Sequence, residues 1–99
     1  MAIYAVTYRY ADKPEVIAEH RPAHREYIAT LLGEGGLIAS GRTEGGDTPS
    51  ALLLFHAESV SHVEEVLNPD PFWTLGLIEK REIVEWILSS GSLGLDSDH

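Results

Sequence analysis

A continuous apolar run at residues 51–56 constrains the fold of this chain more than any other feature. Its sequence, Ala-Leu-Leu-Leu-Phe-His, contains no glycine or proline and has the length of a β-strand. Because neighbouring positions in a strand point to opposite faces of a sheet, such a run needs apolar cover on both faces. Residues 83–88 also carry large apolar groups on both faces, so the sequence predicts a sheet with two apolar faces.

Three more segments are typical of strands. Residues 3–10 are rich in Ile, Val, Thr and Tyr and have no glycine or proline, and their alternation places Tyr8 on the same face as Val6. Residues 37–42 form the second predicted strand, and the polar segment at 43–49 is a loop by composition. The last predicted strand covers residues 77–88 and includes the apolar run at 83–88.

The segment after the first strand has a helical pattern. From Pro22 to about Gly33 the period predicts a helix, and residues 14–20 fit a short helical stretch before it. We expect a helix to start or kink at Pro22, because proline lacks a backbone N–H and restricts the residue before it. One stripe of this helix faces inward in this interpretation and comprises His24, Tyr27, Ile28, Leu31 and Leu32, whereas Arg25 faces elsewhere.

Two shorter helices are predicted later in the chain. Residues 59–67 form the first, with Ser59 or Ser61 as N-cap. The second starts at Pro71, with Asp70 as its N-cap, and runs through Leu75. The predicted order is therefore β-α-β-β-α-β, the ferredoxin-like arrangement of the α+β class.

The second apolar face of the predicted sheet calls for a partner. Helices cover one face, and an uncovered apolar face is unusual on a monomeric protein. Two copies that pack sheet against sheet would bury it, so we expect a homodimer of the dimeric α+β barrel type. The 99 residues are enough for one domain, predicted at 1–88, and the small polar residues at 89–99 predict a flexible C-terminal tail.

The composition argues against several classes of function. The formal net charge is −9, so we expect no nucleic-acid partner and no membrane partner, because phosphate-rich surfaces would repel the chain. The absence of cysteine excludes disulfides, thiolate nucleophiles and Cys-ligated metals. The N-terminal residues do not have the pattern of a signal peptide, and we expect a cytoplasmic protein.

Three segments of the sequence resemble the YCII-related (YciI-like) family. The first is Arg-Pro-Ala-His-Arg-Glu-Tyr-Ile at 21–28, and the second is Gly-Leu-Ile-Ala-Ser-Gly at 36–41. The third is Asp-Pro-Phe-Trp-Thr-Leu-Gly-Leu at 70–77. Their order and spacing are similar to that family over nearly all of residues 1–88.

The resemblance implies a fold and a site. It implies a dimeric α+β barrel with a cleft and a His/Asp active site, which corresponds here to His24 and Asp70. One branch of the family resembles enzymes that remove chloride from chlorinated hydroxyhydroquinones, and nothing in the sequence assigns this chain to that branch. The family commonly has a proline after the glycine that closes the second strand, whereas Arg42 follows Gly41 here.

Each candidate catalytic residue has an ordinary structural alternative. His24 lies one turn before Ile28 on the apolar stripe, where an imidazole can exchange a proton near neutral pH or merely bond a backbone carbonyl. Asp70 can orient that imidazole, or it can simply cap the helix that starts at Pro71. A His–Asp pair without serine or cysteine indicates proton transfer, as in elimination, isomerisation or hydrolysis.

Five further residues are candidates for contact with a substrate. Gly41 would let a ligand approach the backbone, and Arg42 could bind an anionic group, although a solvated arginine is the simpler interpretation. The other candidates are Ser40 at the same strand end and two aromatic residues of a possible cleft, Tyr8 and Phe72. We expect no metal site, since Pro22 spoils the spacing of His20 and His24, and no cofactor, since no phosphate-binding or dinucleotide motif is present.

The sequence therefore supports two functions of different classes. The first is a small enzyme that uses His24 and Asp70 for acid–base chemistry on a small, aromatic or hydroxylated substrate. The second is a non-catalytic ligand-binding or accessory domain on the same dimer, because the ferredoxin-like fold supports many functions.

Overall fold

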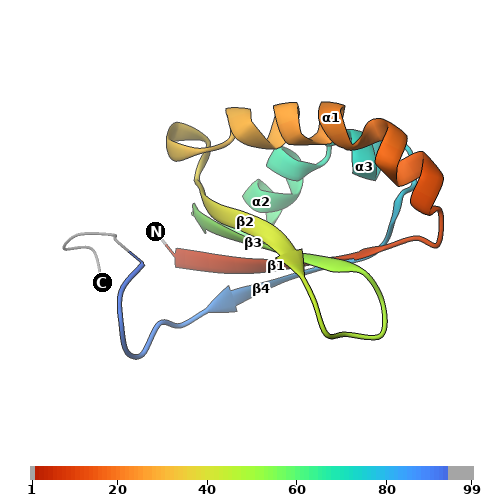
Figure 1. The fold of residues 1–99 in the computed structure, drawn as a ribbon. Coiled ribbons are helices and arrows are strands. Elements are labelled where there is room, and N and C mark those ends of the chain that lie inside the picture. Colours follow the sequence, from red (N-terminus) through yellow and green to blue (C-terminus); the bar gives the residue numbers. More distant parts are fainter. Residues whose placement is uncertain (1, 94–99) are drawn as a thin grey trace.

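The computed structural model describes residues 2–93, which fold as one sheet of four strands with helices on one side (Figure 1). In chain order the elements are β1 (Ala2–Tyr10), α1 (Pro14–Thr30), the 3-10 turn η1 (Gly33–Gly35), β2 (Leu37–Thr43), β3 (Ser50–Ala57), α2 (Val60–Leu67), α3 (Pro71–Thr74) and β4 (Ile78–Trp86).

The sheet has the strand order β2-β3-β1-β4, and every neighbouring pair is antiparallel. The two central strands, β1 and β3, are the first and third along the chain, and the connections between parallel-running strands carry α1 and α2. This is the predicted ferredoxin-like α+β arrangement, which the structure confirms. Figure 1 shows α1, α2 and α3 together above the sheet, so the helices and the sheet form two layers.

The core lies between these two layers. Alternate residues of β1, from Tyr4 to Tyr8, are buried on the helix side, and β3 adds Leu53 and Phe55 beside them. The helices close this core with apolar side chains that are 0–7% exposed: Ile17, Ile28, Val63, Leu67 and Phe72. In α2 the buried residues Val63 and Leu67 are four positions apart, as expected for one face of a helix.

The other face of the sheet is open in the single chain. Leu52 is 41% exposed, Val84 57% and Trp86 39%, although all three are large apolar residues of central or edge strands. The apolar run of β3 is therefore covered on one face, where Leu53 and Phe55 lie, and largely uncovered on the other. This exposed face is the feature that predicted a homodimer from the sequence.

The helix α1 differs from the prediction at Pro22. One continuous helix runs from Pro14 to Thr30, and Pro22 lies inside it rather than starting it. Pro22 cannot donate to the carbonyl of Ala18, so the helix has one backbone hydrogen bond fewer. Both residues are exposed, which lets water bond the free carbonyl and explains why the helix tolerates the proline.

Leu32 was wrongly expected on the inward stripe. The helix ends at Thr30, and Leu32 has extended backbone angles of φ −63° and ψ 144°. Helical spacing therefore no longer applies to Leu32, which is 55% exposed, whereas Leu31 is buried. The chain then turns at Gly36, whose φ of +91° is in the left-handed region, and enters β2.

The two predicted helix caps are present. Ser59 rather than Ser61 caps α2, since its hydroxyl accepts from the backbone N–H of His62 at 3.1 Å. Asp70 caps α3 as predicted, and its carboxylate accepts from the N–H of Phe72. The last strand is shorter than the predicted 77–88, because β4 ends at Trp86.

Residues 87–93 continue beyond β4 without helix or strand. The rest of the predicted tail, residues 94–99, lies outside the described residues, so the flexible tail stays a prediction. Within residues 2–93 no helix has both the length and the apolar character needed to cross a membrane.

Candidate active site

Asp70 is at the centre of the candidate site. It is fully buried because it occupies the turn between α2 and α3 under α1. Its Oδ1 accepts from the N–H of Phe72 at 3.0 Å and lies 2.8 Å from Nδ1 of His24. Its Oδ2 accepts from the hydroxyl of Tyr8 at 3.2 Å. Three partners from different parts of the chain thus compensate the burial of this carboxylate.

His24 meets Asp70 from the inner face of α1. With a carboxylate as its neighbour, Nδ1 carries the proton and donates it, so in the neutral ring Nε2 is the acceptor. Phe72 stacks on the imidazole with 4.0 Å between ring centroids and an angle of 2° between the planes. The His24 side chain keeps 15% exposure, and its Nε2 has no hydrogen-bond partner within residues 2–93.

Tyr8 reaches Asp70 from the sheet. Burial raises the pKa of the Tyr8 phenol well above its ordinary value of 10.0, and the charge of Asp70 and the hydrogen bond to it raise it further. Arg81, which lies opposite Tyr8 on β4, lowers this pKa by a smaller amount. The Tyr8 hydroxyl therefore stays protonated at neutral pH and acts as a fixed donor to Asp70.

A cavity of roughly 560 Å³ opens beside His24, between α1 and the strands β1, β2 and β3. Of the seven predicted site residues, six line this cavity: Tyr8, His24, Ser40, Gly41, Arg42 and Phe72. Asp70 lies behind His24 and does not border the cavity. The structure therefore brings the predicted residues together, while their chemical roles stay predictions.

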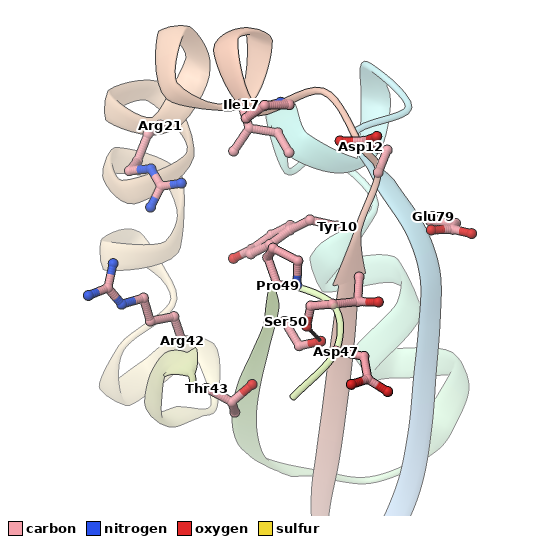
Figure 2. A pocket seen from close by; sticks show the side chains of 13 residues that line it. Tyr10, Asp12, Ile17, Arg21, Arg42, Thr43, Asp47, Pro49, Ser50 and Glu79 are labelled. Carbon is pink, nitrogen blue, oxygen red and sulfur yellow. Dashed lines mark hydrogen bonds between the residues drawn. The ribbon is translucent and has the colours of Figure 1, made fainter. Parts of the chain in front are cut away.

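A second cavity of roughly 510 Å³ adjoins the first (Figure 2). The two cavities share the residues Tyr10, Arg21 and Arg42, so they adjoin each other beside α1. Figure 2 shows Tyr10 projecting across the second cavity with its hydroxyl towards the side where Arg21 and Arg42 lie. Burial raises the pKa of Tyr10, Arg21 lowers it, and Asp70 raises it.

Arg42 is held less firmly than the other predicted residues. Its side chain is 70% exposed and forms an ion pair of 3.1 Å with Glu44. A pair so exposed contributes little, on the order of 0–1 kcal/mol, so Arg42 is free to exchange partners. Both interpretations weighed from the sequence, a solvated arginine and a ligand contact, are compatible with this position.

Sequence reasoning missed several residues of the site. Arg25 was expected to face away from the stripe, yet it borders the cavity beside His24. Arg21 and Tyr10 were also missed, although Arg21 precedes His24 by three positions and Tyr10 alternates with Tyr8. These spacings place Arg21 on the same helix face as His24 and Tyr10 on the same sheet face as Tyr8. Periodicity could therefore have identified both residues from the sequence.

Arg81 was missed for a different reason. It lies among charged residues of β4, and nothing in that pattern marks it as special. In the structure its guanidinium lies over the ring of Trp73, with Cζ 3.7 Å from the ring centroid, and Nη2 donates to Asn68 at 3.0 Å. Its Nη1 is buried and has no hydrogen-bond partner among the described residues.

Comparison with known proteins adds a family and a fold. The family model of the YCII-related domain matches residues 1–87. No curated protein matches the chain. Among solved structures, 5-chloro-2-hydroxyhydroquinone dehydrochlorinase from Burkholderia phenoliruptrix, in complex with 2,5-dihydroxybenzoquinone, is similar with a TM-score of 0.74 and 21% identity. The match covers 88% of this chain and 95% of that protein.

Two further structures are similar in fold. A NIPSNAP-like domain protein from Burkholderia xenovorans has a TM-score of 0.58 and 18% identity, over 91% of this chain and 86% of that one. The cofactor-independent oxygenase SnoaB from Streptomyces nogalater has a TM-score of 0.51 and 9% identity, over 91% of this chain and 94% of that one. At these identities the likeness shows a shared fold.

Proposed function

The chain belongs to the YCII-related family, and we propose that it is a small enzyme in which His24 and Asp70 transfer a proton to or from a small ligand. The observation that carries this proposal is the 2.8 Å contact between Nδ1 of His24 and the buried Asp70 carboxylate, beside a cavity. A histidine with one nitrogen fixed by a carboxylate has its other nitrogen free for general acid–base chemistry.

The proposed roles follow from the contacts. Asp70 holds the Nδ1–H tautomer and stabilises the imidazolium that forms when His24 accepts a proton at Nε2. Tyr8 and the backbone N–H of Phe72 donate to Asp70 and hold its carboxylate in position. Phe72 covers one face of the imidazole and limits its rotation. Asp70 is thus a helix cap and a proposed catalytic partner at once.

The proposed reaction class is elimination, isomerisation or hydrolysis. In an elimination, Nε2 of His24 takes a proton from the ligand, the released electron pair forms a new double bond, and the leaving group departs with its own bonding pair. The dehydrochlorinase of similar fold acts on a chlorinated hydroxyhydroquinone, which supports a small aromatic or hydroxylated ligand here. Ser40, Gly41, Arg42, Tyr8 and Phe72 are the proposed ligand contacts.

We also propose that the protein is a homodimer. The open sheet face, with Leu52, Val84 and Trp86 exposed by 39–57%, supports this proposal. Pairing of two such faces removes apolar surface from water, which is favourable by about 25 cal/mol per Å². The dimer would be an α+β barrel of two sheets, with the helices and the cavities on its outside.

Turnover measurements test the enzymatic proposal. A panel of chlorinated hydroquinones that includes 5-chloro-2-hydroxyhydroquinone would be incubated with the protein, and chloride release would be followed by ion chromatography. Loss of the proton acceptor in His24→Gln and of the charge in Asp70→Asn should each lower the rate by about 100-fold or more. Exchange of ligand protons for solvent deuterium, followed by NMR, extends the test to isomerisation.

His62→Gln is the matched control, because His62 is an exposed residue of α2 outside both cavities. This variant should keep the full rate. A rate that survives His24→Gln would contradict the proposed role of the pair. Ligand binding without turnover or proton exchange in the native protein would favour the second function, a non-catalytic ligand-binding domain.

A further inference from the structure

We infer that the cavity beside His24 binds a small carboxylate with a planar, apolar body, which names the ligand class for the function proposed above. The starting observation is the distribution of charge. The chain has a net charge of −9 and only 7 Lys and Arg residues. Three of those residues, Arg21, Arg25 and Arg42, line this cavity, and no Asp or Glu lines it.

The three arginines come from two elements that border the same cavity as His24. Arg21 and Arg25 lie three positions before and one after His24 on α1, whereas Arg42 comes from β2. Figure 2 shows the guanidinium groups of Arg21 and Arg42 on one side of the adjoining cavity, which both residues also line. Guanidinium groups bind carboxylates through paired hydrogen bonds, so the three arginines favour an anionic group in the cavity beside His24.

These charges are available to a ligand. Arg21 and Arg25 have no ion pair with a carboxylate in the part of the chain that the structure describes. Arg42 has one, with Glu44, and both members of that pair are at least 70% exposed. Exchange of Glu44 for a ligand carboxylate therefore costs little.

The adjoining cavity has a different charge. Asp12, Asp47 and Glu79 line it together with the shared Arg21 and Arg42. Its carboxylates would repel an anion, whereas the cavity beside His24 has none. The anionic group of a ligand therefore belongs in the cavity beside His24.

The rest of the cavity suits a flat apolar body. Phe72 and His24 form one stacked aromatic surface, and Tyr10 meets Phe72 edge-on with 5.7 Å between the ring centroids and 86° between the planes. Apolar side chains complete the lining: Ile28, Ala29, Leu32, Ala51 and Leu53. An aromatic carboxylate satisfies both the arginines and these surfaces.

Titration with benzoate and benzamide tests the inference, because the two probes have the same shape and differ in charge. Affinities would be measured by NMR chemical-shift changes at low salt. Benzoate should bind about tenfold more tightly than benzamide, as expected for a charge-assisted pair, and salt should reduce this preference. Arg21→Gln, Arg25→Gln and Arg42→Gln should each weaken benzoate binding several-fold and leave benzamide binding unchanged.

Lys13→Gln is the control, since it removes the same charge from an exposed position outside the cavity beside His24. It should not alter the preference for benzoate. Equal affinities for the two probes, no benzoate binding at millimolar concentration, or an equal loss in Lys13→Gln would overturn the inference.

Binding is measured here without turnover, so the two proposals can fail separately. Selective benzoate binding in a protein with no His24-dependent turnover would contradict the enzymatic proposal alone. His24-dependent turnover of ligands in a protein that does not distinguish benzoate from benzamide would contradict this inference alone.

Discussion

At the scale of single residues, Asp70 connects the stability of the fold with the proposed chemistry. Its carboxylate caps α3 and accepts from Tyr8, His24 and Phe72 while fully buried. An Asp directly before a Pro in the sequence predicts the helix cap. The contacts of Asp70 with Tyr8 and His24 cannot be predicted in this way, because these residues are 62 and 46 positions away.

Asp70→Ala should lower the free energy of unfolding by about 2–4 kcal/mol. The change removes the cap, at about 1 kcal/mol, and leaves the buried Tyr8 hydroxyl without its acceptor, at about 1–3 kcal/mol. Urea unfolding followed by circular dichroism measures the loss. Ser59→Ala is the control, because Ser59 caps α2 at a more exposed position and should cost only about 1 kcal/mol. Equal losses in both variants would contradict the structural role given to the Asp70 contacts.

At the scale of elements, local sequence signals predicted the helices and strands but failed at the end of α1 and at the proline inside it. Helical spacing identified Ile28 and Leu31 as inward residues. It failed at Leu32, because the helix had already ended, and of the predicted start or kink at Pro22 the start is wrong, since one helix runs from Pro14 to Thr30. Both differences come from the ends and interruptions of an element, which periodicity does not determine.

The turn from α1 into β2 gives an element-scale prediction. Gly36 has φ +91°, and an added Cβ would lie 2.8 Å from the carbonyl oxygen of His56 on β3. Gly36→Ala should therefore lower the free energy of unfolding by about 3 kcal/mol or more, since backbone strain and overpacking add.

Gly33→Ala separates these two causes. Gly33 has φ +70°, but nothing lies within 4 Å of its added Cβ, so only the strain of about 1–2 kcal/mol should remain. Denaturant unfolding of both variants measures the difference. A loss in Gly36→Ala no larger than in Gly33→Ala would show that the turn can move away from β3.

At the scale of the whole molecule, the open face of the sheet is the largest departure from an ordinary monomer. The helices cover one face, and the other presents Leu52, Val84 and Trp86 to solvent. The sequence predicted this from the apolar runs in two strands, and the proposed homodimer is the arrangement that would bury them.

Val84→Glu should shift the protein from dimer to monomer. A carboxylate on the open sheet face would lose its hydration when two such faces pair, without a cation to compensate it. Sedimentation velocity at micromolar concentration measures the change. Val60→Glu is the control, because Val60 is 40% exposed on α2, away from the open sheet face. A native protein that sediments as a monomer would refute the dimer.

The sequence by itself determined the order of strands and helices, the cap at Asp70, and most of the residues that face the core. Neighbouring side chains and backbone sterics decide these features, so a short stretch of chain contains the necessary information. The pairing of His24 with Asp70 was expected only through resemblance to a family. No local pattern relates two residues that are 46 positions apart.

Only the tertiary structure decided how the site is assembled. The antiparallel order of the sheet brings Tyr8 and Arg42 towards α1, and the packing of α1 on α3 places His24 against Asp70 and Phe72. It also collects arginines from α1 and β2 around one cavity of an acidic protein. These contacts join elements that are distant in sequence, and their geometry depends on how whole faces pack together.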